Sequence, residues 1–501
     1  MQFFTVPPKV AAPLDPDFRP AAVANRAFRQ AVEEAGGGEP LVLALERPGG
    51  AVSRLETRIL PETHPQASAN FGYAERLFKF FLWQRGGFRA WVGGPEAVGR
   101  YLQACYAPGG TRAFDHQFMG ETVYGHPFTW VLCRADEVPP AQERYQALGG
   151  HLDGYRIGFD LGASDRKVAA VADGQVVFSE EVIWEPTTQT DPQYHYTEIL
   201  QGLQRAAEHL PRVDAVGGSA AGVYVENQVR VASLFRGVPP ERFDQVRTLF
   251  LRLGQAMGVP LVVVNDGEVA ALAGAMSLET TALLGVALGS SEAAGFVTPE
   301  GLLTDWLNEL AFAPIDYRLH APADEWSGDR GVGSQYLSQQ AVFRLAPQVG
   351  IRIPEHLTKA EKLAYVQDFL EKGHEGARLI WETMGVYLGY AMAHYADFYP
   401  LQHVLILGRC TSGSGGQVLL EAAQSVLRTE FPDLADRIEI HLPDERSRRV
   451  GQAVAAASLP VIPKPHPTPS GFAATPSPLL AGDQERGGGG PKGRGRGEED
   501  R

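Results

Sequence analysis

The sequence predicts an α/β protein with more than one domain. Its 501 residues, of which 44% are hydrophobic and 21% charged, are enough to form several hydrophobic cores. From Tyr155 onward, short apolar β patterns alternate with helical patterns, which is typical of helices layered on sheets. Changes in sequence character predict a boundary near residue 150 and a tail at 460–501.

Residues 1–150 are predicted to form an additional N-terminal α+β domain of unknown role. After a proline-rich start, they contain a strand pattern at 41–45 and a helical pattern at 73–83. No motif in this region indicates its chemistry. Three roles therefore stay open: shaping a substrate pocket, holding a partner, or joining two copies into a homodimer.

The α/β part begins with strands and continues with helices. Strands are predicted at 155–159, 168–172, 176–178, 213–217, 261–264 and 283–288. Thr358 and Glu361 form a capping box at the start of one helix, and a longer helix is predicted to end near Tyr399 because Pro400 cannot continue it. A further strand is predicted at 403–407.

Composition and charge disfavour several classes of protein. The formal net charge of −14 disfavours binding to nucleic acid or to an anionic membrane surface, so we expect neither as a partner. Three distant cysteines cannot form a disulfide framework, and no signal peptide or apolar run of ~20 residues is present, so the expected location is the cytoplasm. Residues 460–501, rich in Pro, Gly and Arg, are predicted to form a disordered tail.

The segment 157–168 has a pattern typical of a phosphate-binding hairpin. One strand ends at Asp160, Gly162 allows a tight turn, and a second strand leaves through Val168. Such a turn directs backbone N–H groups and the Ser164 hydroxyl at one point, and the Asp160 carboxylate stands where Mg²⁺, through water, can bridge it to phosphates. An ordinary β-hairpin is the alternative.

Asp266 directly follows a buried strand pattern and begins a helix. The carboxyl ends of such strands face the crevice in which α/β proteins bind their ligands. A carboxylate there can accept the proton of a hydroxyl that attacks a phosphoryl group. The alternative is that Asp266 only caps the helix.

Three further strand patterns end in loops of small residues. These loops lie at 216–223, 289–295 and 408–416. Small residues let backbone amides approach a phosphate, or let an adenine ring lie against the chain.

In this order, the motifs DLGxS, GSxxG, ND and the two glycine loops resemble the ROK family of sugar kinases and repressors, in the superfamily of hexokinase, actin and the heat-shock ATPases. The resemblance covers about 153–459 and implies a two-lobed ribonuclease H-like (actin-like ATPase) fold, with the first lobe at 151–280, the second at 281–459, and ATP and Mg²⁺ as cofactors. It also implies that a helix around 450–454 packs back against the first lobe. The implied site residues are Asp266 as catalytic base; Asn265, Glu309, Ser219 and Gly222 for the substrate; Asp160, Gly162, Ser164, Lys167, Gly289, Ser290, Gly408 and Gly413 for the nucleotide; and Asp160 for Mg²⁺.

The sequence departs from the family pattern around the sugar site. Glu309 is kept, but Phe312 stands where the family has a histidine, and Ser334 stands where it has a second sugar-contacting glutamate. Phe312 could stack on a sugar ring, line a pocket for a less polar compound, or belong to the core. Residues 316–333 contain no cysteine, so the family's zinc loop is missing and we expect no zinc site.

The second phosphate loop also departs from the pattern. Glu292 replaces a glycine there, and a carboxylate beside phosphates would weaken nucleotide binding unless Mg²⁺ or a base such as Arg409 offset it.

Two functions are therefore hypothesised. The first is an ATP-dependent phosphotransferase that acts on a hydroxyl of a sugar or sugar-like small molecule, which the retained Asp266 favours. The second is a catalytically inactive ROK-like sensor or scaffold that binds nucleotide or sugar, which the departures favour. A transcriptional repressor is disfavoured because residues 1–150 show no helix-turn-helix pattern.

Overall fold

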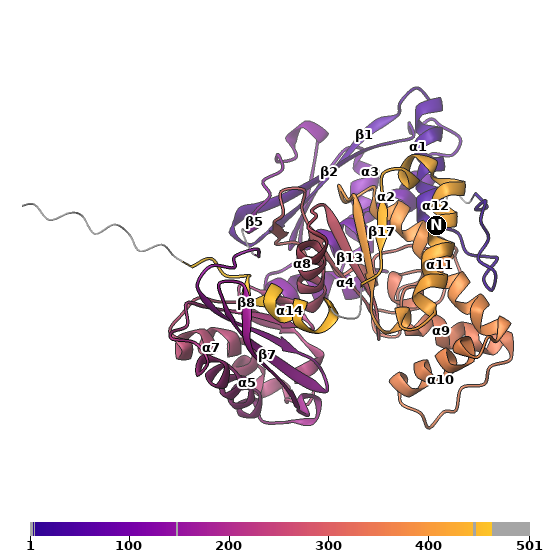
Figure 1. Ribbon diagram of the computed structural model, residues 1–501. Coiled ribbons are helices and arrows are strands. Elements are labelled where there is room, and N and C mark those ends of the chain that lie inside the picture. The colour runs from indigo at the N-terminus through magenta and orange to yellow at the C-terminus, as the bar shows by residue number, and fades with distance from the viewer. Residues whose placement is uncertain (1–3, 5, 147–148, 444–446, 463–501) are drawn as a thin grey trace, which may run out of the picture. The chain divides into compact units, whose positions relative to one another are not determined.

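Two sheets of the computed structural model repeat one strand order, and a third sheet precedes them in the chain (Figure 1). The structure describes residues 4, 6–146, 149–443 and 447–462, and these belong to one compact unit. Part of the predicted tail, 463–501, lies outside the described residues.

The first lobe contains a five-stranded sheet of order β8-β7-β6-β9-β12. Strands β6, β7 and β8 form an antiparallel meander, whereas β9 and β12 run parallel to β6. Its strands are β6 Tyr155–Leu161, β7 Asp165–Ala172, β8 Gln175–Ile183, β9 Ala215–Ala220 and β12 Leu261–Asn265, and the hairpin β10 Val223–Val225 and β11 Gln228–Val231 follows β9. Its helices are α5 Pro192–Ala207, α6 Phe243–Arg247 and α7 Leu249–Met257.

The second lobe repeats this order in the sheet β5-β15-β14-β13-β16-β17, with β5 as an added edge strand. Here β13, β14 and β15 form the meander, and β16 and β17 run parallel to β13. Its strands are β13 Leu283–Leu288, β14 Glu292–Val297, β15 Leu303–Thr304, β16 His403–Leu407 and β17 Glu439–His441, with β5 at Tyr145–Gln146. Its helices are α9 Gln339–Leu345, α10 Lys359–Glu371, α11 Glu375–Tyr395, α12 Gly415–Glu430 and α13 Pro432–Ala435.

The repeated order confirms the predicted two-lobed fold. In each lobe, a three-stranded meander is extended by two parallel strands next to its first strand. Two helices connect the lobes: α8 Asp266–Leu278 packs on β13 and β14, and α14 Ser447–Ala457 packs on β6 and β9 (Figure 1). These helices also contact each other. Because β6, β9 and β12 are parallel, their carboxyl ends lie at one edge of the first sheet.

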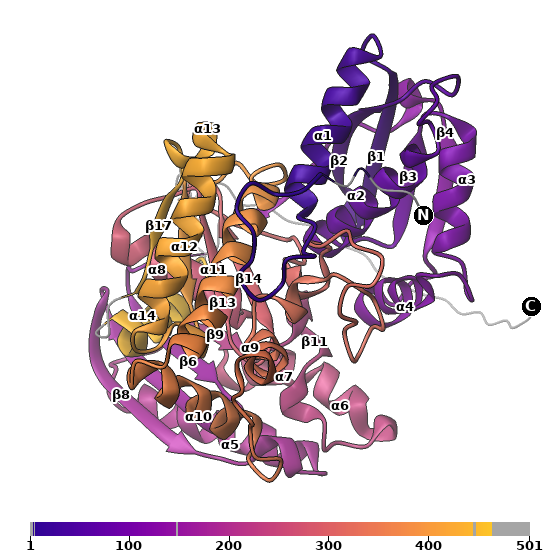
Figure 2. The ribbon, with the colours of Figure 1, turned by 90° about the vertical axis from the view of Figure 1, so that its right-hand side faces the viewer.

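The N-terminal residues form a mixed sheet of order β2-β1-β3-β4, against which α1, α2 and α3 pack (Figure 2). Its elements are α1 Ala21–Glu34, β1 Glu39–Arg47, β2 Ala51–Ile59, α2 Ala69–Arg85, β3 Arg89–Gly93, α3 Glu96–Cys105, α4 Ala113–Gln117 and β4 Thr129–Cys133.

The hydrophobic core of this N-terminal region is continuous with that of the second lobe. Phe80 stacks on Phe398 with ring centroids 3.8 Å apart, and Lys79 forms a 3.0 Å ion pair with Asp329. Strand β5 also pairs with β15 of the second sheet. The predicted division at residue 150 therefore stays a prediction.

Several predicted element ends differ from the structure: β1, α2, β6, β7 and β8 are all longer than the patterns that predicted them, and two other ends are shifted. The long helix α11 ends at Tyr395, four residues before Tyr399, because the chain continues in a turn in which the Phe398 N–H donates to the Tyr395 carbonyl. Strand β9 begins at Ala215, two residues later than predicted. Among the described residues, no helix combines the length and the apolar character needed to cross a bilayer.

Candidate active site

Asp160 lies near the carboxyl end of β6, beside β9. Ser219 is its partner across the ladder, and the Ser219 hydroxyl donates a 2.6 Å hydrogen bond to the Asp160 carboxylate. Desolvation raises the pKa of Asp160, although this hydrogen bond and the charge of Lys167 oppose the rise. Ser219 is fully buried, so in this structure it positions Asp160, whereas the sequence predicted a substrate contact.

Asp266 is the first residue of α8, but Asn265 is the cap of this helix. The Asn265 Oδ1 accepts a 2.7 Å hydrogen bond from the Gly267 N–H, and its Nδ2 donates 2.8 Å to the Gly222 carbonyl. Asp266 accepts a longer hydrogen bond of 3.1 Å from the same Gly267 N–H. The capping role considered for Asp266 is thus carried mainly by Asn265.

Gly222 is required by this arrangement. It has a φ of 136°, and a Cβ at this position would overlap the Val231 carbonyl oxygen. Its backbone therefore approaches β11 closely while its carbonyl faces Asn265.

Desolvation raises the pKa of three carboxyl groups around the start of α8. Desolvation and the charge of Asp160 raise the pKa of Asp266 to about 6. Desolvation and the charge of Asp266 raise the pKa of Glu309 to about 7, and desolvation is the main reason that the pKa of Glu268 rises to about 8. Asp266 thus lies within electrostatic reach of both Asp160 and Glu309, the two other carboxyl groups that the sequence assigned to this site.

Glu292 is buried at the β13–β14 turn, whereas the sequence predicted a charged side chain beside phosphates. It is the first residue of β14, only 2% exposed, and its Oε1 accepts a 2.7 Å hydrogen bond from the Tyr395 hydroxyl. Desolvation raises its pKa to about 8, so the neutral form predominates at pH 7. The expected electrostatic penalty on nucleotide binding is therefore corrected: the group is buried and protonated, and needs no compensation by Arg409.

Two other departures from the family pattern lie in the core. Phe312 is 8% exposed and packs against Trp83, Phe114 and Trp326 with centroid distances of 4.4, 6.3 and 5.3 Å. Ser334 is also buried, and its hydroxyl donates to Asp324 at 3.0 Å. Of the roles considered for Phe312, the structure supports the core role.

The first predicted phosphate loop forms the tight turn between β6 and β7. The Gly162 N–H donates to the Asp165 carbonyl at 2.9 Å, which closes the turn. The exposed Ser164 donates to the Asp165 carboxylate at 2.9 Å, and Lys167 forms a 3.0 Å ion pair with it. The charge of Arg409 also contributes to lowering the pKa of Asp165, so the loop after β16 lies within electrostatic reach of this hairpin.

The two predicted nucleotide loops of the second lobe are neighbours. Gly289 closes the turn between β13 and β14 through a 3.0 Å hydrogen bond from its N–H to the Ser291 carbonyl, and Ser290 in this turn is exposed. Gly408 has a φ of 100°, and a Cβ there would overlap the backbone of Leu288, the last residue of β13. The loop after β16 thus lies against the start of the β13–β14 turn.

Glu371 occupies the far end of the loop after β16. This last residue of α10 accepts hydrogen bonds from the Ser414 N–H and hydroxyl, at 2.7 and 3.0 Å. Gly413 has a φ of 64°, and a Cβ on it would overlap the Glu371 carboxylate. A nucleotide that used the Ser414 amide would have to displace this carboxylate.

A cavity of about 560 Å³ lies at the junction of β12 and α8, although Asp160, Asp266 and Glu309 are not among the residues that line it. Asn265 and Glu268, on either side of Asp266 in the sequence, line it together with Gly222. Further walls come from the β10–β11 hairpin, from residues 304–307 and from the N-terminal region. This volume is within the range of about 300–1,000 Å³ typical of small-molecule sites.

The N-terminal wall of the cavity is held by a buried arginine. Arg47 forms ion pairs of 2.8 Å with Glu143 and 3.1 Å with Asp305. Glu143 also accepts a 2.9 Å hydrogen bond from the Trp306 indole, and all four side chains line the cavity. Of the three roles left open for residues 1–150, the structure supports shaping a pocket.

Sequence reasoning missed Glu268, Arg47 and Glu143. Glu268 carried a signal, because it stands two residues after Asp266 in the first turn of an otherwise apolar helix. Arg47 and Glu143 carried none, since residues so distant in sequence reach the cavity only through the tertiary structure.

No family model matches this chain, and no curated protein matches its sequence. Solved structures are similar to it. A ROK hexokinase from Thermus thermophilus is 17% identical, with a TM-score of 0.48 over 60% of this chain and 97% of that one. A ROK family glucokinase from Streptomyces griseus, in complex with glucose and AMPPNP, is 20% identical, with a TM-score of 0.44 over 61% and 98%.

A third similar structure is a ROK family transcriptional regulator, a homolog of the E. coli MLC protein. It is 18% identical, with a TM-score of 0.49 over 62% of this chain and 78% of that one. At such identities, the similarity concerns the fold alone. These structures belong to the family that the sequence motifs resemble.

Proposed function

We propose that this chain is an ATP- and Mg²⁺-dependent phosphotransferase that acts on a hydroxyl group of a sugar or sugar-like small molecule in the cytoplasm. One observation carries the proposal: the desolvated carboxylate of Asp266 directly follows β12, within electrostatic reach of Asp160, and its sequence neighbours Asn265 and Glu268 line a cavity of about 560 Å³. This combines a proton acceptor with space for a small substrate.

Asp266 is the proposed general base. With a pKa of about 6, it is mainly ionised at pH 7 yet far more basic than an ordinary aspartate. A base whose pKa lies near the working pH transfers protons most effectively. Asp266 would take the proton of the substrate hydroxyl, while Asn265 and Gly222 hold the adjoining wall of the cavity.

The residues near Asp160 fit Mg²⁺ and the phosphates of ATP. Mg²⁺ prefers oxygen ligands, and the Asp160 carboxylate, whose pKa is raised by desolvation, gains from a cation nearby. When bound, Mg²⁺ supplies positive charge that offsets the charge of the phosphates. The turns that Gly162 and Gly289 close would face the nucleotide phosphates, and Gly408 would support its adenosine part.

The cavity supports a hydroxyl-rich substrate. Arg47, Thr304 and Asp305 add polar groups to those of Asn265 and Glu268 on its walls. Such groups hydrogen-bond hydroxyls and discriminate against analogues that lack them. The loss of the family's histidine and second glutamate means that this set of contacts is the chain's own.

The test is ATP consumption by wild-type chain over hexoses, amino sugars and polyols, compared with Asp266→Asn. We expect this variant to lose about 10²- to 10⁴-fold in turnover while it still binds a nucleotide analogue. The matched control is Asp244→Asn, because Asp244 is an exposed acid of the first lobe. Turnover by the wild type should also fall as the pH drops through about 6, where Asp266 is protonated.

Equal turnover by wild type and Asp266→Asn would refute the assignment of the base. A wild-type chain that binds nucleotide but consumes no ATP with any compound of the panel would instead identify the sensor or scaffold. The second function also has structural support, because Arg47, Glu143 and Asp305 form a polar cavity wall that can bind a ligand without catalysis.

A further inference from the structure

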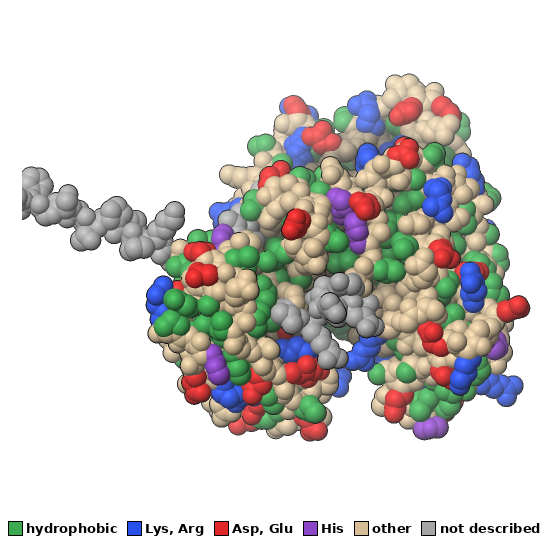
Figure 3. All heavy atoms as spheres, viewed as in Figure 1, with side chains coloured by type: hydrophobic (Ala, Val, Ile, Leu, Met, Phe, Trp, Pro, Cys, Tyr) green, Lys and Arg blue, Asp and Glu red, His purple; other side chains and the backbone are tan. Residues whose placement is uncertain are grey.

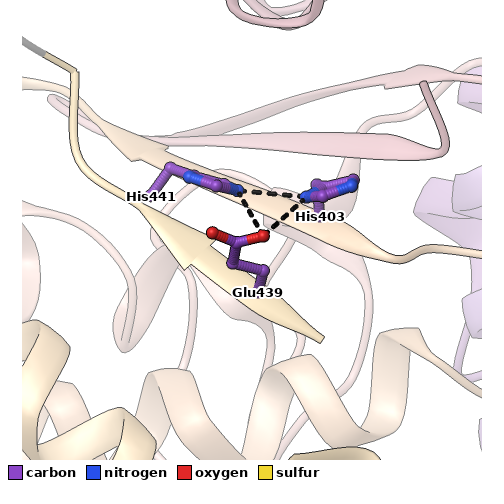
Figure 4. A group of neighbouring side chains, drawn as sticks. All are labelled: His403, Glu439 and His441. Atoms are coloured by element: carbon purple, nitrogen blue, oxygen red, sulfur yellow. Dashed lines mark hydrogen bonds and ion pairs between the residues drawn. The ribbon is translucent and has the colours of Figure 1, made fainter. Parts of the chain in front are cut away.

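Two histidines and a glutamate meet on neighbouring strands of the second lobe, away from the site described above. His403 is the first residue of β16, and Glu439 and His441 are the first and last residues of β17. The strands are parallel, with His403 opposite Glu439 and Leu405 opposite His441. Because side chains alternate between faces, all three polar side chains lie on one face of the sheet (Figure 4).

The donor atoms of these side chains converge. The Nδ1 of His403 lies 3.1 Å from the Nε2 of His441, and the Glu439 Oε2 lies 3.6 and 4.0 Å from these two nitrogens. Two imidazole nitrogens that share a Zn²⁺ at 2.0–2.1 Å would be about 2.8–3.4 Å apart. The two rings therefore already have the separation of a chelating pair.

The third donor needs only a small movement. The Glu439 side chain is 69% exposed, whereas those of His403 and His441 are 22% and 17% exposed. The rings are thus held by their surroundings, and the carboxylate is free to move toward them. Figure 3 shows histidine side chains at the surface beside an acidic side chain, on the face of the molecule that carries β17.

We propose that His403, Glu439 and His441 bind a divalent transition metal, with Zn²⁺ as the best-fitting ion. Imidazole nitrogens combined with one carboxylate suit zinc-like ions, whereas Mg²⁺ prefers oxygen ligands throughout. Sequence reasoning expected no zinc because it considered only the missing cysteines at 316–333. The donors here are of a different type and lie in a different place.

This metal site is separate from the proposed nucleotide loop. The loop follows the carboxyl end of β16, whereas His403 lies at its amino end, about 13 Å away along the strand. A bound ion would link β17, the edge strand of the sheet, to β16. Edge strands have one unpaired side, so the site would fasten the outermost strand of the second lobe.

The experiment measures Zn²⁺ binding to the full chain by calorimetry and by metal analysis after dialysis, with Mg²⁺ as the comparison ion. The variants are His403→Gln and His441→Gln, and the matched control is His320→Gln, because His320 is exposed and lies outside this cluster. We expect one Zn²⁺ per chain in wild type and control. Either cluster variant should weaken this binding by more than the roughly 10- to 100-fold that loss of a group orienting a ligand costs.

A second measurement compares the unfolding temperature of each variant with and without Zn²⁺, so a difference in stability between variants does not affect it. Zn²⁺ should raise the unfolding temperature of wild type and His320→Gln, but not of the two cluster variants, since a ligand stabilises the state that binds it. Glu439→Gln keeps both rings and should weaken Zn²⁺ binding to a smaller extent. Equal Zn²⁺ binding by wild type and both histidine variants, or no Zn²⁺ binding by wild type, would overturn the proposal.

Discussion

Asp266→Asn should make the folded chain more stable at neutral pH while it removes turnover. Asp266 is charged and desolvated, and the nearby charge of Asp160 repels it. Asparagine has nearly the same shape, and its Oδ1 can still accept the hydrogen bond from the Gly267 N–H. The variant therefore removes a charge and little else.

The size of this gain follows from the pKa. The pKa of Asp266 is raised from 3.8 to about 6, and each pKa unit corresponds to about 1.4 kcal/mol. The ionised group thus costs the folded chain up to about 3 kcal/mol. Asp266 is partly exposed, so solvent screening reduces this cost, and asparagine must also be desolvated. We expect the free energy of unfolding to rise by about 1–3 kcal/mol.

The gain must depend on pH in a definite direction. The pKa of Asp266 is higher in the folded than in the unfolded chain, so folding takes up a proton between about pH 4 and pH 6. The cost of ionised Asp266 is absent below this window, grows as the pH rises through it, and is complete above it. The difference between variant and wild type should therefore be largest at about pH 8 and vanish near pH 4.

Urea unfolding of wild type, Asp266→Asn and the control Asp244→Asn at pH 5 and pH 8 tests this prediction. The control removes an exposed acid and should change the free energy of unfolding by less than about 0.5 kcal/mol. Equal stability of wild type and Asp266→Asn at pH 8, or a difference that grows toward acid pH, would refute the reasoning.

Two further predictions concern packing. Gly217→Ala in β9 should destabilise the chain by several kcal/mol in urea unfolding, because the new Cβ would overlap the Ala456 carbonyl of α14. The control Gly451→Ala lies in α14, where a Cβ meets only an ordinary contact at 3.8 Å, and it should not destabilise the chain. Equal effects of the two substitutions would contradict this account. Tyr395→Phe removes the hydroxyl that donates to Glu292, so it should lower the free energy of unfolding by about 1–3 kcal/mol and raise the pKa of Glu292. An unchanged free energy of unfolding in urea would contradict this prediction.

Much of the two-lobed fold could be predicted from local patterns. The strand patterns at 155–159, 261–264, 283–288 and 403–407 all lie within strands, because buried strands read as apolar runs that end at glycine or polar residues. The capping box of Thr358 and Glu361 also forms as predicted. Such signals are local, so the sequence carries them directly.

The end of α11 could not be predicted, because it depends on distant residues. Proline at 400 permits the helix to continue as far as Tyr399, but Phe398 leaves it to stack on Phe80 of α2. Contacts of this kind depend on tertiary structure that no sequence window contains.

The candidate site divides in the same way. Asp160 and Asp266 were recognised because each ends a strand pattern. The burial and protonation of Glu292 could not be predicted, because they depend on the direction in which one side chain points from the turn. The cavity wall made by Arg47 and Glu143 was also hidden, because no motif marks residues that line a pocket by tertiary contact.

The continuous core of the N-terminal region and the second lobe has a consequence for how the chain comes apart. Trp83 and Phe312 lie in the same apolar interior, although more than two hundred positions separate them. Heating should therefore unfold these two regions in one cooperative step. A truncated chain that begins after residue 150 would expose a large apolar surface to water and should aggregate. A related protein without an N-terminal region of this kind would need polar side chains on the corresponding surface of its second lobe.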